Sequence, residues 1–181
     1  MISQQERYST FATVPPEAER TSHTVVRFSA MEFVIRQALP SDVPRIEGLV
    51  REAYKHYIPR IGKLPGPMSD KYDARVAEGA VWVLTISAEI AGIVVLIPKP
   101  RYLLLDNVAV SPEHPSRGLG RRLMDFAEAQ AKDHGFTEIR LYTNAAMHEN
   151  LAMYTNLGYQ EFARGFQDGF HRIFMKKQLA L

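Results

Sequence analysis

The feature that most constrains the fold of this chain is a glycine loop between a β-rich stretch and an amphipathic helix. The β-rich stretch ends at Val110, and the loop that follows carries Gly118 and Gly120. Beyond the loop, apolar residues recur at helical spacing, namely Leu119, Leu123, Phe126, Ala127 and Ala131. The pattern therefore predicts a strand, a loop and a helix in direct succession, which is typical of α/β domains.

The two glycines lie where the predicted helix begins, and this position suits a bound phosphate. The first turn of a helix has N–H groups without partners inside the helix, and they carry the positive end of its dipole. Gly118 and Gly120 place no side chain between a phosphate and the backbone, while Arg117, Arg121 and Arg122 add positive charge. The loop predicts a pyrophosphate cradle, and a turn needed only for packing is the alternative interpretation.

Other phosphate-binding loops fit this segment less well. A P-loop needs Gly-Lys followed by Ser or Thr, but Gly120 is followed by Arg121. A dinucleotide fingerprint needs a third glycine where Leu123 stands, and an acidic residue where Thr143 and Asn144 stand. These departures argue against a nucleotide-phosphate binder of either fold.

The rest of the chain alternates between strand and helix patterns. Besides the strand before the loop (102–110), we expect strands at 33–38, 80–87, 90–97, 139–141, 159–163 and 170–176. We expect helices at 46–57, between a cap at Ser69 or Asp70 and Gly79, at 119–131 up to Gly135, and at 151–157. Prolines and glycines from Pro59 to Pro67 should break the chain, while Ala88-Glu89 and Asp168-Gly169 should turn two hairpins. This order predicts an α/β domain with a mixed sheet.

Length and composition narrow the class of protein. The chain has 181 residues, which is the size of one domain. It has no cysteine, so disulfides, thiolate metal sites and cysteine nucleophiles are excluded, and its six histidines lack metal-ligand spacing, so no metal is predicted. A net charge of +2 is too balanced to indicate nucleic acid. Apolar runs such as 93–97 are too short for a membrane span, and a cytoplasmic location is the simplest expectation.

The first thirty residues differ from the rest of the chain. Residues 1–30 are rich in Ser, Thr, Gln and Pro and show neither a secretory signal nor a clear transit peptide. We interpret them as an N-terminal extension of low order, followed by one domain at 31–181. One hypothesis is that the working chain begins at Met31, immediately before the first predicted strand.

With strand, loop and helix in place, the sequence resembles the GCN5-related N-acetyltransferase (GNAT) superfamily over residues 33–178. The acetyl-CoA loop of that family, Q/R-x-x-G-x-G/A, maps onto residues 115–120, where Pro115 replaces the usual Gln or Arg and lacks an N–H. The second family pattern maps onto Tyr154, Gly158 and Tyr159. Met147 stands at the usual Asn position, so Asn144 or Asn150 would take over the contact with pantetheine.

The resemblance implies a mostly antiparallel mixed sheet, flanked by helices, in which two parallel strands splay apart to admit acetyl-CoA as co-substrate. The residues it assigns to the pantetheine arm are Val108, Ala109 and Val110, with Asn150 beside them. The residues it assigns to the pyrophosphate are Ser116, Arg117, Gly118, Leu119, Gly120 and Arg121. The acetyl thioester would lie beside Tyr154.

The implied reaction is direct attack of a primary amine on the thioester in a ternary complex. Tyr154 is the candidate acid that protonates the departing thiolate, because a tyrosine is neutral at pH 7 and can donate a proton. The N–H of Val110 would stabilise the charge that develops on the carbonyl oxygen. Asp106 is the candidate base, directly or through water, with His148 and Glu149 as alternatives.

The acceptor would lie between the connector at 56–68 and the last hairpin turn at 165–170. The connector is rich in prolines and carries cations that suit a carboxylate or a phosphate on a small amine. A protein N-terminus or lysine is an alternative acceptor, and a non-catalytic acyl-CoA sensor is an alternative of a different class. Surface strands near the C-terminus are compatible with a homodimer.

Overall fold

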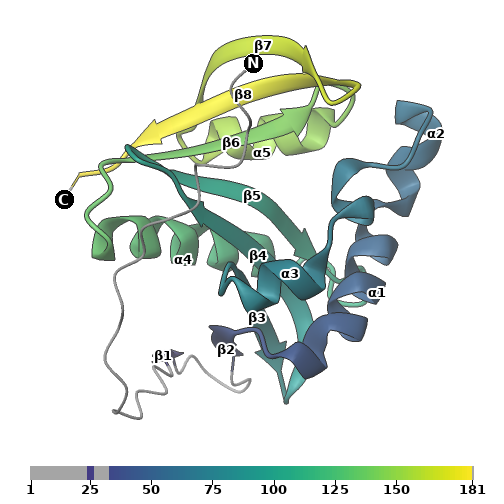
Figure 1. Cartoon of the computed structure of the whole chain (residues 1–181), viewed down its shortest axis with the longest axis vertical. Coiled ribbons are helices and arrows are strands. Elements are labelled where there is room, and N and C mark those ends of the chain that lie inside the picture. The colour runs from purple at the N-terminus through teal and green to yellow at the C-terminus, as the bar shows by residue number, and fades with distance from the viewer. Residues whose placement is uncertain (1–23, 27–32, 181) are drawn as a thin grey trace, which may run out of the picture.

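One sheet runs through the part of the chain that the structure, a computed structural model, describes: residues 24–26 and 33–180 (Figure 1). Its eight strands lie in the order β1-β2-β3-β4-β5-β6-β8-β7. The pair β5–β6 is parallel, and the other neighbouring strands of this sheet are antiparallel. The expected mixed, mostly antiparallel α/β fold is therefore confirmed.

The elements follow the predicted order closely. The strands are β1 (Thr24–Val26), β2 (Phe33–Gln37), β3 (Val81–Ile86), β4 (Glu89–Pro98), β5 (Leu103–Val110), β6 (Glu138–Asn144), β7 (Gln160–Gln167) and β8 (Phe170–Gln178). The α-helices are α1 (Val43–Tyr54), α2 (Ile58–Ile61), α3 (Tyr72–Ala77), α4 (Leu119–Asp133) and α5 (His148–Asn156). Short 3-10 turns lie at Pro40–Asp42, Lys55–Tyr57 and Gly66–Ser69.

Two hydrophobic cores hold these elements together, one on each face of the sheet. One core joins α4 and the Tyr154 side of α5 to the sheet, through residues such as Leu123, Leu105 and Ile139. The other joins α1 and α3 to the opposite face, through residues such as Ile46. The helices thus cover both faces and leave the gap beyond the β5–β6 pairing between them (Figure 1).

The structure differs from the sequence prediction at several local points. Thr24–Val26 forms strand β1 on the edge of β2, although residues 1–30 were expected to be an extension of low order. The other residues of 1–30 lie outside the described residues. Pro59 does not break the chain but sits in the first turn of α2, where its missing N–H costs nothing. The domain boundary at residue 31 stays a prediction.

Two other local predictions were wrong in detail. The first hairpin turns at Ser87-Ala88 rather than one residue later, because both residues adopt positive φ, at 49° and 71°. Among the described residues no side chain caps α3, whose N-cap residue is Lys71; Asp70 instead accepts hydrogen bonds from the Lys71 N–H and from Arg75. The Asp168-Gly169 turn is as expected, with φ of 52° and 78°.

An ion pair fixes the entry into α1 and gives a prediction for stability. Arg36 donates two hydrogen bonds to Asp42, at 2.6 and 3.0 Å, and Asp42 also accepts the Leu39 N–H at 2.8 Å. The Arg36 hydrogen bond holds the pKa of Asp42 below its usual value. Asp42 therefore stabilises the fold above its unfolded pKa, and that stabilisation is lost as the pH falls through the lower folded pKa.

We expect Asp42→Asn to lower the free energy of unfolding by about 1 kcal/mol at pH 7. Because protonation removes the same charge from the unmodified protein, the difference between the two proteins should shrink as the pH falls below about 4. Urea unfolding of both proteins at pH 7 and at acid pH measures this. A difference of constant size at every pH would contradict the assignment.

Strand β7 forms one edge of the sheet, and all of its residues are exposed, with Phe166 at 66%. Such an edge offers unpaired backbone groups to another strand. A homodimer through this edge stays a prediction. In the described residues, no helix is both long enough and apolar enough to cross a lipid bilayer.

Candidate active site

The two parallel strands part after a short pairing, and the site lies where they part. Strands β5 and β6 are paired only from Leu103 with Ile139 to Leu105 with Leu141. Beyond that point β5 continues along β4, and β6 continues along β8. The splay expected from the family resemblance is therefore present, and it leaves the ends of β5 and β6 facing a gap.

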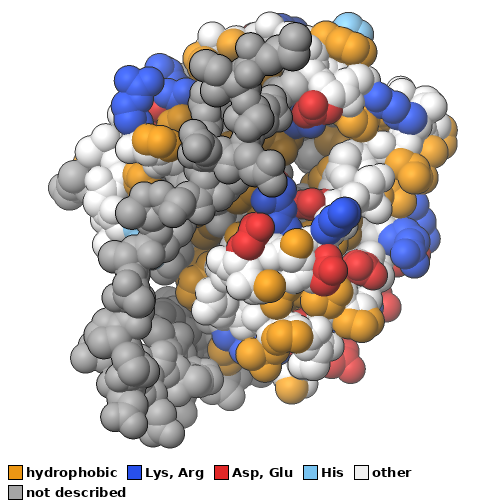
Figure 2. Space-filling model, viewed as in Figure 1, with side chains coloured by type: hydrophobic (Ala, Val, Ile, Leu, Met, Phe, Trp, Pro, Cys, Tyr) orange, Lys and Arg blue, Asp and Glu red, His pale blue; other side chains and the backbone are white. Residues whose placement is uncertain are grey.

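A cavity of about 260 Å³ fills this gap. Both splayed strands line it, together with α1, α5, the connector and the start of β8. The predicted site residues that reach it are Asp106, Val108, Asn144, Asn150 and Tyr154. Figure 2 shows acidic and basic side chains gathered on this face of the molecule. Residues as far apart in the sequence as Tyr54 and Arg172 thus meet in one place.

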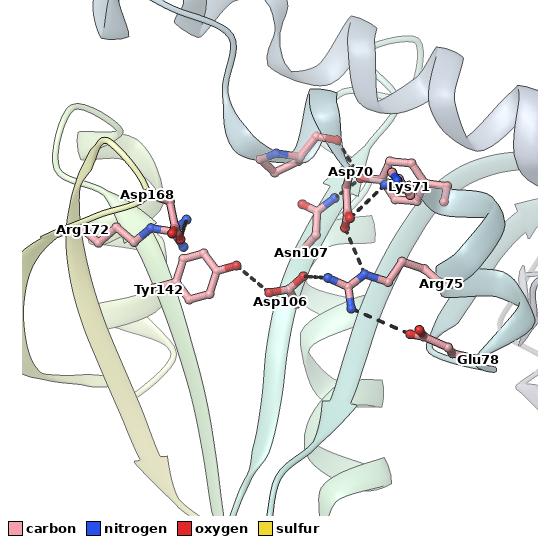
Figure 3. A network of polar contacts seen from close by, with 11 residues as sticks. Asp70, Lys71, Arg75, Glu78, Asp106, Asn107, Tyr142, Asp168 and Arg172 are labelled. Carbon is pink, nitrogen blue, oxygen red and sulfur yellow. Dashed lines mark hydrogen bonds and ion pairs between the residues drawn. The ribbon is translucent and has the colours of Figure 1, made fainter. Parts of the chain in front are cut away.

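Asp106 lies at the centre of a polar network that spans the gap (Figure 3). Its carboxylate accepts a hydrogen bond from the hydroxyl of Tyr142, which comes from the opposite strand β6. On its other side it lies 3.6 Å from the guanidinium of Arg75, on α3. Burial and the neighbouring carboxylate raise the pKa of Tyr142 to about 12, so its hydroxyl keeps the proton that it donates.

Sequence reasoning missed Arg75, Tyr142 and Arg172, all of which line the cavity. Arg75 stands on a short helix that was noted only for its apolar residues, and Arg172 stands within a hairpin strand. One signal was available for Tyr142: it follows Leu141 on a strand that the family resemblance places beside the gap. No comparable signal marked the two arginines.

Asn107, the residue after Asp106, ties the helical layer to β5. The Asn107 side chain is buried and accepts a hydrogen bond from the Tyr54 hydroxyl at 2.6 Å. It donates one to the Tyr72 oxygen at 3.0 Å, and Tyr72 donates to the carbonyl of Pro67 at 3.1 Å. These bonds fix α1, α3 and the connector against the strand that carries Asp106.

Tyr154 is buried, with 5% of its surface exposed, and its side chain lines the cavity from α5. Its ring packs edge to face against Tyr159, at 6.1 Å between centroids. Burial raises the pKa of Tyr154 above its ordinary value, so the phenol stays protonated at neutral pH. A neutral phenol beside the gap can donate a proton to an atom bound in the cavity.

The two asparagines near α5 both line the cavity, but their partners differ. The Asn144 side chain accepts the Ala146 N–H at 2.9 Å and so shapes the turn before the helix. Asn150 contacts the hydroxyl of Tyr57 at 3.4 Å and the sulfur of Met147 at 3.6 Å. Met147, at the family's usual Asn position, is buried in the core that contains α1. Asn150 is therefore the better placed of the two for a ligand.

The glycine loop leads into α4 with an uncapped N-terminus. Gly118 is the N-cap residue with φ of 68°, and no side chain of the described residues caps the helix. A Cβ added at Gly118 would meet nothing within 4 Å, and one at Gly120 would meet only Val110, at 3.9 Å. Packing inside the protein therefore does not require glycine at position 120, and the space in front of these amides is open.

The side chains in and after the glycine loop make different contacts. Leu119 is buried in the core, so only its backbone could contact a ligand. Arg121 pairs with Asp125 one turn along the helix, at 2.8 Å, and Arg122 lies over the ring of Phe33, at 4.7 Å. Ser116 adopts a positive φ of 58° in the loop. A phosphate cradle at this loop would therefore consist mainly of backbone N–H groups.

The cations of the connector do not line the cavity, contrary to the role suggested for them in acceptor recognition. Arg60 pairs with Glu149 at 2.8 Å and donates to the Ala146 carbonyl, which ties α2 to α5. Lys63 donates to the carbonyl of Gly169 and lies 3.7 Å above the ring centroid of Phe170. The connector and the last hairpin thus contact each other beside the cavity, and Ile61, Pro65, Gly66, Pro67 and Phe170 face it.

The alternative bases lie outside the cavity. His148 and Glu149 are both exposed on the first turn of α5, and neither lines the gap. The hydrogen bond from Arg60 lowers the pKa of Glu149 to about 2. Of the three candidate bases, Asp106 is the one that faces the cavity.

A sheet that parts between two parallel strands, with a glycine loop leading from the first of them into a helix, defines the class of acetyltransferase that the sequence resembles. The chain belongs to the Acetyltransferase (GNAT) family, whose sequence model matches residues 46–159, more than half of the chain.

Curated relatives match the chain over shorter regions. N-acetyltransferase family 8 member 2 of Rattus norvegicus is 27% identical over 96 residues, which cover 50% of this chain and 42% of that protein. N-alpha-acetyltransferase 80 of Mus musculus is 40% identical over 65 residues, which cover 36% of this chain and 19% of that protein. The matched regions thus span less than half the length of these relatives.

Solved structures share the fold. PaiA N-acetyltransferase from Thermoplasma acidophilum, solved in complex with coenzyme A, aligns with a TM-score of 0.68 and 18% identity. The alignment covers 81% of this chain and 98% of that one. At this identity the likeness establishes the fold.

Proposed function

We propose that this protein is an N-acetyltransferase that moves the acetyl group of acetyl-CoA to a primary amine of a small molecule by direct attack in a ternary complex. Membership of the GNAT family gives the class of reaction. The observation that carries the proposal for this chain is the juxtaposition of an open helix N-terminus with a cavity between splayed strands that holds a buried tyrosine and a carboxylate.

The open end of α4 supports the binding of the co-substrate. The backbone N–H groups of residues 116–121 would bind the pyrophosphate, because they carry the positive end of the helix dipole and no side chain at Gly118 or Gly120 stands in front of them. Val108, Ala109 and Val110, on the part of β5 that β6 leaves unpaired, would pair with the pantetheine arm as an added strand. Asn150 would contact the same arm from α5.

The chemistry needs one proton donor and one acceptor. The attacking amine loses a proton, the C–N bond forms, and the C–S bond of the thioester breaks. Tyr154 would donate its phenolic proton to the departing thiolate, and the N–H of Val110 would stabilise the carbonyl oxygen as it gains charge. After attack, the nitrogen releases its second proton to solvent as the neutral amide forms, and Tyr154 regains its proton from solvent after the thiol leaves.

Asp106 would take up the proton from the ammonium form of the acceptor. Arg75 and the Tyr142 hydroxyl hold its carboxylate in place between the two strands. An amine with a pKa near 10 is almost fully protonated at pH 7, so an acceptor for that proton is needed before attack. Asp106 would act directly or through water.

The test of the proposal is thiol release from acetyl-CoA over a panel of amines, together with calorimetric binding of acetyl-CoA. We expect saturable binding and amine-dependent thiol release. Saturable binding without turnover of any amine would favour the acyl-CoA sensor. Failure of acetyl-CoA to bind would overturn both the transferase and the sensor.

Asp106→Asn should lower kcat/KM at pH 7 by about tenfold, because the amide cannot accept the ammonium proton. As the pH rises toward 10, more acceptor is already neutral in solution, so the deficit should shrink. The pH profile of kcat/KM for the variant measures this. Asp133→Asn, on the exposed surface of α4, is the control. A deficit of the same size at every pH would point to a role in structure alone.

A further inference from the structure

Arg172 on β8 carries an N–H group that the fold does not use. Its guanidinium lies 4.0 Å from the ring centroid of Tyr142, and its Nη2 lies 3.2 Å from the exposed carboxylate of Asp168 (Figure 3). The side chain is 12% exposed, and its Nε is buried without a hydrogen-bond partner among the described residues. A buried cationic donor without an acceptor is costly unless a ligand supplies one.

The other cation of the cavity is already neutralised. Arg75 lies 3.2 Å from Asp70, 3.6 Å from Asp106 and 3.8 Å from Glu78, measured between nitrogen and oxygen atoms. Its charge is therefore shared among three carboxylates. Of the cavity's two arginines, Arg172 is the one whose Nε–H is buried without a hydrogen-bond acceptor in the part of the chain that the structure describes.

Tyr142 separates the two charged ends of the cavity. Its hydroxyl donates to Asp106, and the face of its ring lies beneath Arg172. The cavity thus presents the carboxylate of Asp106 next to the hydroxyl of this ring and the guanidinium of Arg172 over its face (Figure 3). A molecule with a positive group and a negative group matches this arrangement.

We propose that the acceptor is a small amine that also carries a carboxylate, with its amine at Asp106 and its carboxylate at Arg172. The inference rests on the proposed function and narrows its acceptor. A guanidinium suits a carboxylate because its N–H groups form charge-assisted hydrogen bonds in a fixed plane. A cavity of about 260 Å³, beside which Lys63 joins the connector to the hairpin, favours a small molecule over a protein N-terminus.

The first experiment compares amino acids with their carboxamides, such as phenylalanine with phenylalaninamide and methionine with methioninamide. Thiol release gives kcat and KM, and calorimetry with the CoA-loaded protein gives binding without turnover. We expect the acids to be favoured by about tenfold or more, mainly in KM and in Kd. The amides have the less basic amines, so more of each is neutral at pH 7, and a preference for the acids would not come from a larger supply of free amine.

Two outcomes of this comparison would overturn the inference. One is that the carboxamides, or short peptides with a free N-terminus, are acetylated as well as the acids or better. Such a result with the peptides would indicate a protein acceptor. The other is binding of acetyl-CoA without measurable binding of any carboxylate-bearing amine. Failure of acetyl-CoA itself to bind would instead overturn the proposed function, so the two failures can be told apart.

Variants at position 172 assign the preference to this side chain. Arg172→Gln should raise the KM for the acids about tenfold relative to the KM for the amides, so that the preference for the acids is lost. Arg172→Lys should keep part of the preference, and it tests the charge if the Gln variant unfolds. Arg164→Gln, on the exposed edge strand β7, is the matched control. A preference that survives in both Arg172 variants would contradict the assignment.

Discussion

Gly120→Asp is expected to weaken the binding of acetyl-CoA by at least about 100-fold, and in practice to abolish it. Gly120 is the second residue of α4, and its missing side chain leaves open space in front of the first-turn amides. An aspartate there would put a carboxylate where the pyrophosphate is proposed to bind, so steric overlap and like charge would act together. Calorimetric titration with acetyl-CoA measures the effect.

The same substitution should not harm the fold. A carboxylate in the first turn of a helix interacts favourably with the helix dipole, and glycine is the poorer helix former. The melting temperature should therefore be unchanged or higher, which separates loss of binding from loss of structure. Gly120→Ala is a milder substitution at the same position. We expect it to stabilise the fold by about 0.5–1 kcal/mol and to weaken the binding of acetyl-CoA moderately.

Gly48→Asp is the matched control for the charge. Gly48 lies within α1, and a Cβ added there also meets nothing within 4 Å. The variant adds the same charge to a different helix, so its Kd for acetyl-CoA should equal that of the unmodified protein. An unchanged Kd in Gly120→Asp would rule out the proposed cradle.

Tyr154→Phe should lower kcat by about 100-fold while the Kd of acetyl-CoA stays nearly the same. The phenol is the proposed donor to the departing thiolate, and general acid catalysis typically contributes effects of this size. Burial raises the pKa of Tyr154, so the unmodified enzyme should show no loss of kcat through this group up to pH 9. Single-turnover thiol release with a saturating amine measures the step.

The Tyr154→Phe variant should keep its fold, so a loss of kcat could not be attributed to unfolding. The Tyr154 hydroxyl has no hydrogen bond within the described part of the chain, and the ring would keep its contact with Tyr159 in the variant. Tyr102→Phe, outside the cavity and near the guanidinium of Arg140, is the control and should leave kcat unchanged. An unaffected kcat in Tyr154→Phe would assign the proton to another donor or to water.

Both predictions concern features that the sequence carries locally. The strand, the glycine loop and the helix are consecutive, so their order and the position of Gly118 and Gly120 can be recognised from periodicity and turn chemistry. The same holds for the hairpin at Asp168-Gly169, where the residue types themselves favour positive φ. Ser87-Ala88 shows the limit, because neither residue type signals the left-handed backbone that the turn adopts there.

The charged part of the site is different, because residues distant in sequence form it. Arg75 on α3, Asp106 on β5, Tyr142 on β6 and Arg172 on β8 meet only when the sheet is assembled in its register. Cations that looked suitable for the acceptor, Arg60 and Lys63, are instead used to hold the walls together. No periodicity in the sequence encodes these partners.

Local sequence patterns predicted the class of fold, the glycine loop that leads into a helix, and the tyrosine of the second family pattern. The packing of distant elements decides which carboxylate faces the cavity, which arginine lies among three carboxylates, and which one keeps a buried N–H without a hydrogen-bond partner among the described residues. The physical reason is range: turn and helix preferences act over a few residues, whereas the pairing of buried charges depends on which strands and helices pack against one another.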